Sequence, residues 1–378
     1  MGNSLNEHRY QLRVLDTSNQ VVAIYDDLTS LYYRQQVNHA GMAVCTIPAN
    51  HGLLTYATDD QLIEIFISYR AVPDIGTEFG QVWTSDYLGL YRDKQIATDG
   101  DGNIYYLLYF PHVNEILIRY TIAYPAGTND RTTWTGQQIA VIANDIIRWN
   151  LTPEATIANG RIRNAQVIRS MNDAGAIGGT PVVDFTIGPG RNVLEVLQEL
   201  APISGFDFQV DKDSFTPSEL WCEQAAGQLG TDKSANIIFD LNLDNVASAN
   251  LNGDRLREKT VAIVGGQGQD SSRTFVTRTG DNHSATNDYE FFIDARTAGT
   301  TIELNTIGDA KLGELKARSQ LNAGVAASFG YMYKRDYGLG DLVTVKFGNV
   351  SATRKIDRVE VKFDQDQRVD IQIGFADV

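Results

Sequence analysis

Three segments near the C-terminus alternate apolar and polar residues with a period of two, and no other feature of the sequence restricts the fold as strongly. They are LVTVKF at 342–347, KIDRVEVKF at 355–363 and VDIQIGF at 369–375, linked by the polar stretches FGNVSATR and DQDQR. Successive side chains of a β-strand point to opposite faces, so this alternation predicts strands with one buried face. The short links predict that the three strands form an antiparallel meander.

The first ninety residues carry the same strand signal. Five short segments there are rich in β-branched and aromatic residues and are separated by polar turns: YQLRVLD, VVAIYDD, MAVCTIPA, QLIEIFISY and QVWTSDYLGLY. Residues of these types pack well on a pleated surface. The sequence therefore predicts a β-rich N-terminal domain.

A polar loop joins the next two strand-like runs in KQIATDGDGNIYYLLYF. Residues 99–103 are of the types that tolerate a positive φ, as a tight hairpin turn requires. A calcium-binding EF-hand loop starting at Asp99 would need glycine at its sixth position and glutamate at its twelfth. Ile104 and Phe110 stand there instead. The pattern therefore favours a hairpin turn over a metal site.

The middle of the chain changes to a helical period. In TGQQIAVIANDIIRWN, Thr135 and Gln138 form a capping-box pattern, and the apolar residues that follow recur at helical spacing. In NVLEVLQELAPISG, Asn192 is placed to cap a second helix and Gly205 to end it. PHVNEILIRY predicts a third, shorter helix, and the strands VVDFTI and FDFQV flank the second one. Together these segments predict a mixed α/β insert.

Strands return in the last part of the chain, in LWCEQ, NIIFDLN, TVAIVGG, RTFVTRT and YEFFIDA. One helix is expected among them, at about 307–321. Leu312 and Leu315 would face a core, and Glu314 would pair with Arg318 one turn later.

Two strand segments from opposite ends of the chain resemble each other. DDQLIEIFI, from Asp59 to Ile67, and GDLVTVKF, from Gly340 to Phe347, share an acidic turn residue followed by an apolar-polar-apolar strand. This suggests that the N-terminal and C-terminal β regions are copies of one another. Asp341, at the mouth of its strand, can accept hydrogen bonds from nearby backbone amides, so we expect a structural role for it.

Charge and cysteine content exclude several classes of protein. Lysine and arginine total 32 against 47 aspartate and glutamate, which gives a formal net charge of −15. Tight binding of nucleic-acid phosphates needs a cationic face, so specific nucleic-acid binding is not expected. Cys45 and Cys222 lie far apart and predict neither a disulfide framework nor a zinc site. The N-terminus has no apolar signal core, and no apolar run is long enough to span a membrane.

The sequence contains no complete GxSxG, HExxH, Walker A or GxGxxG motif. The loop GGQG at 265–268 leads into a strand rather than a helix, so it predicts a hairpin turn and not a dinucleotide site. The histidines are scattered, with none at metal-ligand spacing from another: His8, His39, His51, His112 and His283. We therefore predict no enzyme, and we assign no catalytic, cofactor-binding or metal-binding residue.

Taken in order, several segments resemble the tail-hub proteins of long-tailed phages, a tail-associated family related to the baseplate hub of contractile tails. They are LTSLYYRQQVNHAGMAVCTIPANH followed by DDQLIEIFISYR, then EILIRYTI, TVAIVGGQGQDSSRTFV, YEFFIDAR and YGLGDLVTVKFGNVSATRKIDRVEVKF. No single segment is specific, and the resemblance rests on their order over about residues 10 to 375.

The resemblance implies a mainly β, α+β chain with two related β-barrel-like hub domains and a mixed α/β insert. The expected parts are an N-terminal hub domain at 1–92, the insert at 93–215 and a C-terminal region at 216–378 with the second hub domain. It also implies a homotrimer whose six barrels form a ring in the virion, at the tail tip or baseplate.

In such a ring, tail-tube and distal-tail proteins would lie above and fibre or spike proteins below. DNA would pass through a lumen whose acidic wall repels phosphates during genome ejection. Hub proteins of this kind often carry a C-terminal extension, whereas this chain ends at Val378, so we expect the hub alone.

Two other functions are compatible with the sequence. A tail-tip cell-wall hydrolase would use carboxylates that no motif locates, and it predicts clearing in zymography. A binding module for a host receptor or polysaccharide would use the insert or the loop TGDNHSATND at 279–288. Exposed aromatic residues such as Trp134 and Trp149 could stack on sugars, although Trp149 lies on a predicted helix.

Overall fold

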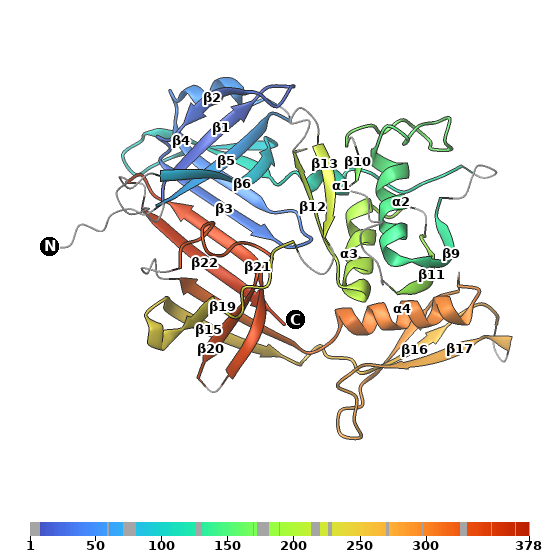
Figure 1. The fold of residues 1–378 in the computed structure, drawn as a ribbon. Helices are drawn as coiled ribbons and strands as arrows, with labels where there is room; N and C mark the ends of the chain where they lie inside the picture. The colour runs from blue at the N-terminus through green and yellow to red at the C-terminus, as the bar shows by residue number, and fades with distance from the viewer. Residues whose placement is uncertain are drawn as a thin grey trace.

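The structure is a computed structural model that describes residues 8–377, except for 59, 71–80, 126–130, 169, 172–180, 189, 213–219, 226–228, 270–271, 297, 326–330, 349 and 367. Strands dominate it, and helices gather on one side (Figure 1). The predicted mainly β, α+β class is confirmed.

The largest sheet has ten strands and draws on both ends of the chain. Its main path runs in the order β15 (Val246–Asp254), β19 (Arg318–Val325), β22 (Val369–Ala376), β21 (Val350–Phe363), β3 (Ser30–Gln36), β4 (Met42–Pro48), β8 (Ile104–Pro111) and β7 (Asp93–Thr98). β20 (Leu342–Phe347) pairs with β21 and with the short β14 (Ile238–Asp240). The predicted meander of the last three strands is confirmed.

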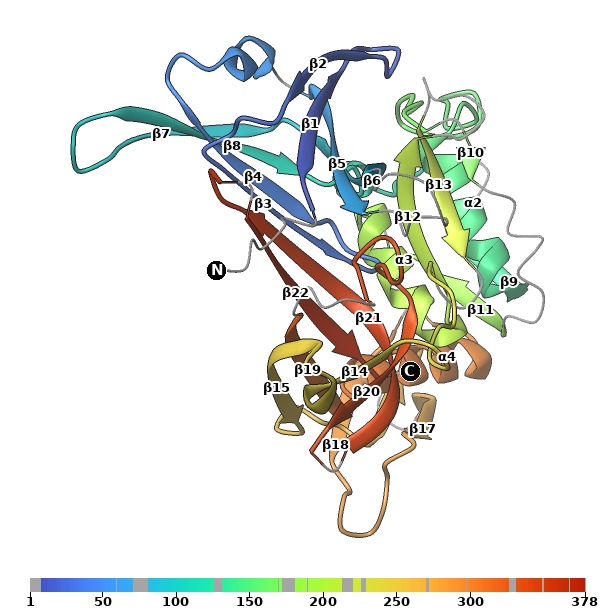
Figure 2. The same ribbon diagram turned by 60° about the vertical axis from the view of Figure 1, so that its left-hand side comes forward.

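The N-terminal and C-terminal parts of this sheet meet at β3 and β21. The two strands are antiparallel, with Arg358 opposite Gln36 and Phe363 opposite Leu31. Figure 2 shows the blue β3 beside the red β21. The described strands do not close into a barrel. The edge strands β3 and β21 pair with each other, so the two halves of the chain form one continuous sheet.

A four-stranded sheet covers one face of the N-terminal strands. It has the order β2 (Val21–Tyr25), β1 (Tyr10–Leu15), β5 (Leu62–Arg70) and β6 (Gln81–Leu90). One hydrophobic core lies between the layers and includes Leu12, Ile65, Tyr33 and Val361, all fully buried. Strands from both ends of the chain therefore share a core, and the proposed domain boundary at 92/93 is crossed by the pairing of β8 with β4.

The insert forms a second core around two helices. It contains α1 (Glu115–Ile118), β9 (Thr133–Gln138), α2 (Ile139–Leu151), β10 (Ser170–Met171), β11 (Val182–Thr186), α3 (Val193–Ser204), β12 (Asp207–Lys212) and β13 (Leu220–Ala225). The predicted caps of α3 are confirmed: the Asn192 side chain accepts a hydrogen bond from the Glu195 amide, and Gly205 ends the helix at a φ of 68°. The predicted capping box of α2 is wrong, because residues 133–138 are extended in β9 and pair with β11.

A small module, called the outer module and covering residues 261–314, interrupts the C-terminal strands between β15 and β19. It contains β16 (Val261–Gly265), β17 (Phe275–Thr279), β18 (Glu290–Asp294) and α4 (Thr301–Glu314). The GGQG stretch turns β16 into β17, as predicted. The helix begins and ends earlier than predicted, so Leu315 and Arg318 lie beyond it, and Glu314 pairs with Lys311 instead.

Candidate assembly interface

Two hairpins in the large sheet have the same turn. In the β7–β8 hairpin, Asp99 accepts hydrogen bonds at Oδ1 from the amides of Asp101 and Asn103, at 3.0 and 2.9 Å. In the β21–β22 hairpin, Asp364 accepts from Asp366 and Arg368 at 2.9 and 2.8 Å. The predicted hairpin at 99–103 is thus confirmed, and the same geometry recurs near the C-terminus.

The strands on both sides of these turns have the same register. Asp93 lies opposite Tyr109, and Arg358 lies opposite Gly374. The second pair corresponds to the first after a shift of 265 positions along the chain. The correspondence continues into the neighbouring strands. Cys45 pairs with Leu31 on one neighbouring strand and with Leu108 on the other. In the same way, Ala323 pairs with Ala249 and with Ile373. The sheet therefore consists of two four-stranded units: a first unit of β3, β4, β8 and β7, and a second unit of β15, β19, β22 and the C-terminal half of β21.

The loop before each unit's hairpin repeats as well. The amide of Asp60 donates to the Tyr91 carbonyl at 3.1 Å, and the Tyr91 amide donates to Gln61. In the second copy the Gly340 amide donates to Ile356 at 2.8 Å, and Ile356 donates to Asp341. Asp60 and Gly340 both have positive φ, 60° and 86°. These matches support the predicted relation between residues 59–67 and 340–347.

Asp341 has the structural role that the sequence suggested. Its carboxylate accepts hydrogen bonds from the amides of Thr231 and Gly338, both at 2.7 Å, and pairs with Lys233 at 2.9 Å. The residue is only 4% exposed. It therefore fastens the loop before β14 to the loop before β20.

The two hairpins differ sharply in their burial. Val361 of the second unit is fully buried, whereas Ile96, at the equivalent position of the first unit, is 58% exposed. Ile371 is 7% exposed, whereas its equivalent Tyr106 is only partly buried. Figure 2 shows the β7–β8 hairpin extending away from the body of the molecule. Its exposed apolar face continues the core-facing side of the sheet.

The cover over the second hairpin comes from the N-terminal half. Phe363 packs against the ring of Tyr10, with centroids 5.0 Å apart, and β3 lies along the edge of β21. In the described part of the chain, no strand other than β8 pairs with β7, and none other than β19 pairs with β15. Within the chain, the edge strand β3 of the first unit therefore pairs with the edge strand β21 of the second. The other edge strand of each unit, β7 or β15, has no such partner among the described residues.

Buried charge pairs fix the insert and the two halves against each other. Asp207 of β12 accepts from Lys355 at 2.7 Å and also binds Asn38. Glu64 of β5 pairs with Lys212 of β12. Nothing in the sequence pattern links partners so far apart in the chain, so these pairs were not predicted.

A third buried carboxylate joins the two halves of the chain directly. Asp86 has a fully buried side chain that accepts from the hydroxyls of Tyr33 and Tyr333, at 2.6 and 2.8 Å, and pairs with Lys334 at 3.0 Å. Burial, together with the charge of Asp86, holds the pKa of both tyrosine hydroxyls well above the usual value. Because the two tyrosines come from opposite halves of the chain and bind the same buried carboxylate, this cluster fixes the geometry of the two halves.

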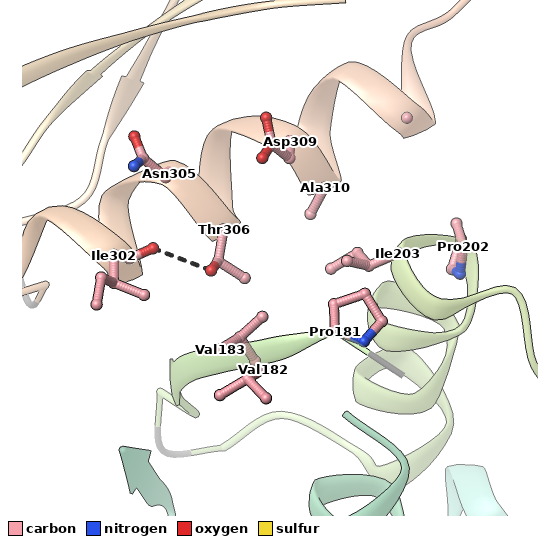
Figure 3. A pocket seen from close by; sticks show the side chains of 11 residues that line it. Pro181, Val182, Val183, Pro202, Ile203, Ile302, Asn305, Thr306, Asp309 and Ala310 are labelled. Atoms are coloured by element: carbon pink, nitrogen blue, oxygen red, sulfur yellow. Dashed lines mark hydrogen bonds between the residues drawn. The ribbon is translucent and has the colours of Figure 1, made fainter. Parts of the chain in front are cut away.

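A pocket of about 460 Å³ lies between the insert and α4 (Figure 3). Ile302, Thr306 and Ala310 of α4 face Val183 and Ile203 across it. Its one carboxylate belongs to Asp309, which forms a double hydrogen bond with Arg278 at 2.7 and 2.9 Å. The pocket lining is therefore largely apolar, and none of its residues forms a nucleophile–base pair.

The histidines are spread over the described structure and do not meet. His112 is buried under Tyr87, and burial lowers its pKa to about 4. His51 caps the short helix η1 (Gly52–Tyr56) and contacts Asp27. The described residues bring no three metal-binding side chains together, and none of their helices is long and apolar enough to cross a membrane.

Residues considered for other roles also have defined places. Cys45 is buried, as expected, and the side chain of Cys222 lies outside the described residues. Trp134 packs near Phe185 and donates to Asp145, and Trp149 lies on α2 beneath Arg131. The loop 279–288 connects β17 to β18.

Comparison with known proteins gives one family and several similar structures. The chain matches the family of siphovirus ReqiPepy6 Gp37-like proteins over residues 11–375. No curated protein sequence matches it.

The 43 kDa tail protein of prophage MuSo2 from Shewanella oneidensis has a similar structure, with a TM-score of 0.58 and 15% identity over 97% of this chain and 98% of that one. A tail protein from Neisseria meningitidis MC58 has a TM-score of 0.58 and 11% identity over 98% and 96%. Prophage tail protein gp18 from Listeria monocytogenes EGD-e has a TM-score of 0.52 and 12% identity over 97% and 94%.

Proposed function

Because the chain belongs to the family of siphovirus ReqiPepy6 Gp37-like proteins, we propose that it is a structural hub of the phage tail, in which three copies form a ring that joins the tail tube to the tail tip. The prophage tail proteins with the same fold support a place in the tail. The repeat of the four-stranded unit carries the ring proposal.

The repeat specifies how two copies would join. Within the chain, β21 of the second unit pairs with β3 of the first. The equivalents of these two strands are β7 and β15, and both are open edges among the described residues. If β7 of one copy pairs with β15 of the next in the same register, Ile96 lies opposite position 251, as Val361 lies opposite Tyr33. The exposed apolar face of the β7–β8 hairpin would then be covered as its equivalent is.

Such a contact is head-to-tail, and it closes into a ring when the rotation between units divides a full turn. Each chain supplies two units, so three chains supply six. A threefold object with six similar units can meet a sixfold tail tube above and a threefold fibre or spike below. These partners, and the related hub domains themselves, are part of the proposal.

The face of the two units that points away from the core would line the lumen. Among the side chains that the structure describes, its strands carry both basic and acidic ones, such as Arg34, Arg358 and Lys362 beside Asp93, Glu360 and Asp370. We therefore propose a lumen wall of mixed charge along these strands, rather than the uniformly acidic wall expected from the net charge. Neither arrangement binds DNA phosphates tightly.

Solution mass tests the ring. Native mass spectrometry of the full chain, alone and mixed with tube and distal-tail proteins, should show a trimer. Ile96→Lys places a charge on the apolar face that the neighbour would cover, and it should shift the protein to a monomer. Ile157→Lys, at a position that is 61% exposed on the insert, is the matched control and should stay trimeric. A wild-type monomer under all conditions, or a trimer unaffected by Ile96→Lys, would overturn the proposal.

A further inference from the structure

The second unit has an exposed leucine turn beside its open edge. The turn is the short 3-10 helix η3 (Leu241–Leu243), which follows β14 and comes just before β15. Leu241 is 43% exposed and Leu243 is 53% exposed. Two exposed leucines next to a strand edge that has no second partner among the described residues indicate a surface that a partner covers.

Hydrogen bonds fix the shape of this turn. The Asp240 carboxylate accepts from the Asn242 amide at 2.9 Å, and Asp244 ends the turn at a φ of 53°. Asn245, only 1% exposed, accepts from the Asp240 amide and donates to the Ile238 carbonyl, at 2.9 and 2.7 Å. The leucines are therefore presented in a defined conformation, which reduces the entropy that is lost when a partner binds.

The internal repeat identifies the counterpart of β14 in the first unit. Because β5 and β20 follow equivalent loops, Ile65 corresponds to Val345. Leu12 of β1 lies opposite Ile65, and Phe239 of β14 lies opposite Val345. Leu12 and Phe239 are both fully buried. In the second unit, β14 therefore takes the place of β1, although it runs parallel to its neighbour instead of antiparallel.

Within the chain, the N-terminal end of β1 covers the tip of the β21–β22 hairpin. The ring of Tyr10 packs on that of Phe363, with centroids 5.0 Å apart. His8 lines a small cavity of about 40 Å³ together with Val369 and Ile371. Tyr10 and His8 are each 1% exposed, so this contact excludes water.

The equivalent surfaces are exposed on both sides in a single copy. Leu241 stands two residues from Phe239, at the position that corresponds to Tyr10. On the hairpin side, Val369 corresponds to Ile104 after the shift of 265 positions, and Ile104 is 49% exposed. In the described part of the chain, the leucine turn and the β7–β8 hairpin thus leave apolar side chains in water where their counterparts touch.

These two surfaces belong to opposite ends of the large sheet. β7 and β15 are the terminal strands of its main path, and Figure 2 shows them far apart. The leucine turn lies next to β15 in the chain, so it can reach the β7–β8 hairpin of another copy but not its own.

We propose that the Leu241–Leu243 turn of one copy docks on Ile104 and the adjoining apolar face of the β7–β8 hairpin of the next copy. This docking rests on the proposed ring and adds a side-chain contact to the pairing of β7 with β15. Pairing between strand edges uses mainly backbone groups, which any strand can offer. An apolar contact beside the edge selects one register and one partner. The leucine turn therefore makes the edge specific for a second copy of this chain.

A charge exchange across the contact tests the docking. Analytical ultracentrifugation of the full chain over a range of concentrations measures trimer association. We expect Leu243→Lys alone, and Ile104→Glu alone, to weaken association by at least about tenfold. The double variant places opposite charges at one contact and should recover at least about fivefold of the combined loss. Ile162→Lys, at a position that is 62% exposed on the insert, is the matched control and should associate as the wild type does.

The outcomes separate this docking from the ring itself. A wild-type trimer that Ile96→Lys disrupts and Leu243→Lys leaves intact would overturn the docking while the ring stands. Losses in both single variants without recovery in the double variant would mean that the leucines contact another surface, which also overturns it. A wild-type monomer would refute the ring and the docking together. Circular dichroism of each variant separates loss of the contact from loss of the fold.

Discussion

The contact between Gly340 and Gly230 shows how single residues determine the position of the C-terminal strands. A Cβ atom on Gly340 would lie 2.7 Å from the Gly230 amide nitrogen, and its φ of 86° disfavours any side chain. A Cβ atom on Gly230 would lie 2.3 Å from the Asp341 nitrogen. The two loops approach so closely because the Asp341 carboxylate accepts hydrogen bonds from both of them. The aspartate was identified in the sequence as structural, but its partners, more than a hundred residues away, could not be.

Gly340→Ala should therefore be far more damaging than alanine at a glycine with similar backbone geometry. Gly348 also has a positive φ, 57°, but a Cβ atom there would meet open space. We expect Gly348→Ala to lower the free energy of unfolding by about 1 kcal/mol, from backbone strain alone. Gly340→Ala adds the clash with Gly230, and its loss should be at least about twice as large. Urea unfolding measures both, and equal losses would show that the close approach is unimportant.

His112 should make stability depend on pH. Burial lowers its pKa in the folded protein to about 4, below the ordinary value of 6.5. Its contribution is complete above pH 6.5 and is lost as the pH falls toward 4, because the unfolded chain then takes up the proton first. The loss should be about 1.4 kcal/mol per pH unit in that window.

The histidine variants test this directly. Urea unfolding at pH 7 and pH 4.5 should show a smaller difference for His112→Gln than for the wild type. His283→Gln changes an exposed histidine and should keep the wild-type difference. An unchanged pH dependence in His112→Gln would contradict the assignment.

At the scale of elements, the sequence predicted strands where hydrophobic alternation was strong and missed them where it was weak. The hairpin at 99–103 and strands β20 to β22 were predicted from alternation and turn chemistry. β15, with the sequence VASANLNGD, was missed because small and polar residues dominate it. It is a strand because β19 pairs with it, and such long-range pairing overrides local propensity.

Helix boundaries show the same limit. The pattern located α2, but its expected capping box lies in β9, where pairing with β11 keeps the chain extended. The pattern also located α4, but its cap is Thr300, whose hydroxyl accepts from the Glu303 amide at 3.1 Å. The candidate interface was predictable only as a likeness between two short segments. Its full extent required the strand registers.

The inferred pairing of β7 with β15 predicts a disulfide between copies. Equivalence to the pair Lys362 and Tyr32 places Ala97 of one copy opposite Asn250 of the next. Opposed residues of antiparallel strands have Cα atoms about 4.5–5.5 Å apart, which a disulfide can bridge. The double variant Ala97→Cys, Asn250→Cys should give covalent trimers on mild oxidation.

Gels without reductant measure this cross-link. The variant Ala97→Cys, Ser284→Cys is the control, because Ser284 lies in the loop of the outer module, and it should give no cross-linked trimer. Cross-linking in the control, or only random multimers in the test variant, would contradict the register.

At the scale of the whole molecule, the fold keeps the free edges of the large sheet apart from the insert and the outer module. In the described part of the chain, the ten-stranded sheet has open edges at both ends of its main path, and the insert and the outer module lie to one side of it in Figure 1. Buried pairs such as Asp207 with Lys355 join these parts within one chain. The resemblance to phage tail proteins that the sequence suggested is confirmed by the family and the fold. The trimer remains a prediction, because symmetry between copies is not encoded in any local pattern.

Assembly should change the exchange of backbone amides at both free edges of the sheet and nowhere near the outer module. Edge strands present unpaired N–H groups to water, and these exchange quickly unless another strand covers them. Hydrogen-exchange mass spectrometry of the wild type and of monomeric Ile96→Lys should show amides of β7 and β15 exchanging at least about tenfold more slowly in the trimer. β17, an edge strand of the outer module, should exchange equally in both. Protection of β17 in place of β7 and β15 would mean that copies meet through the module, and the repeat would then have no role in assembly.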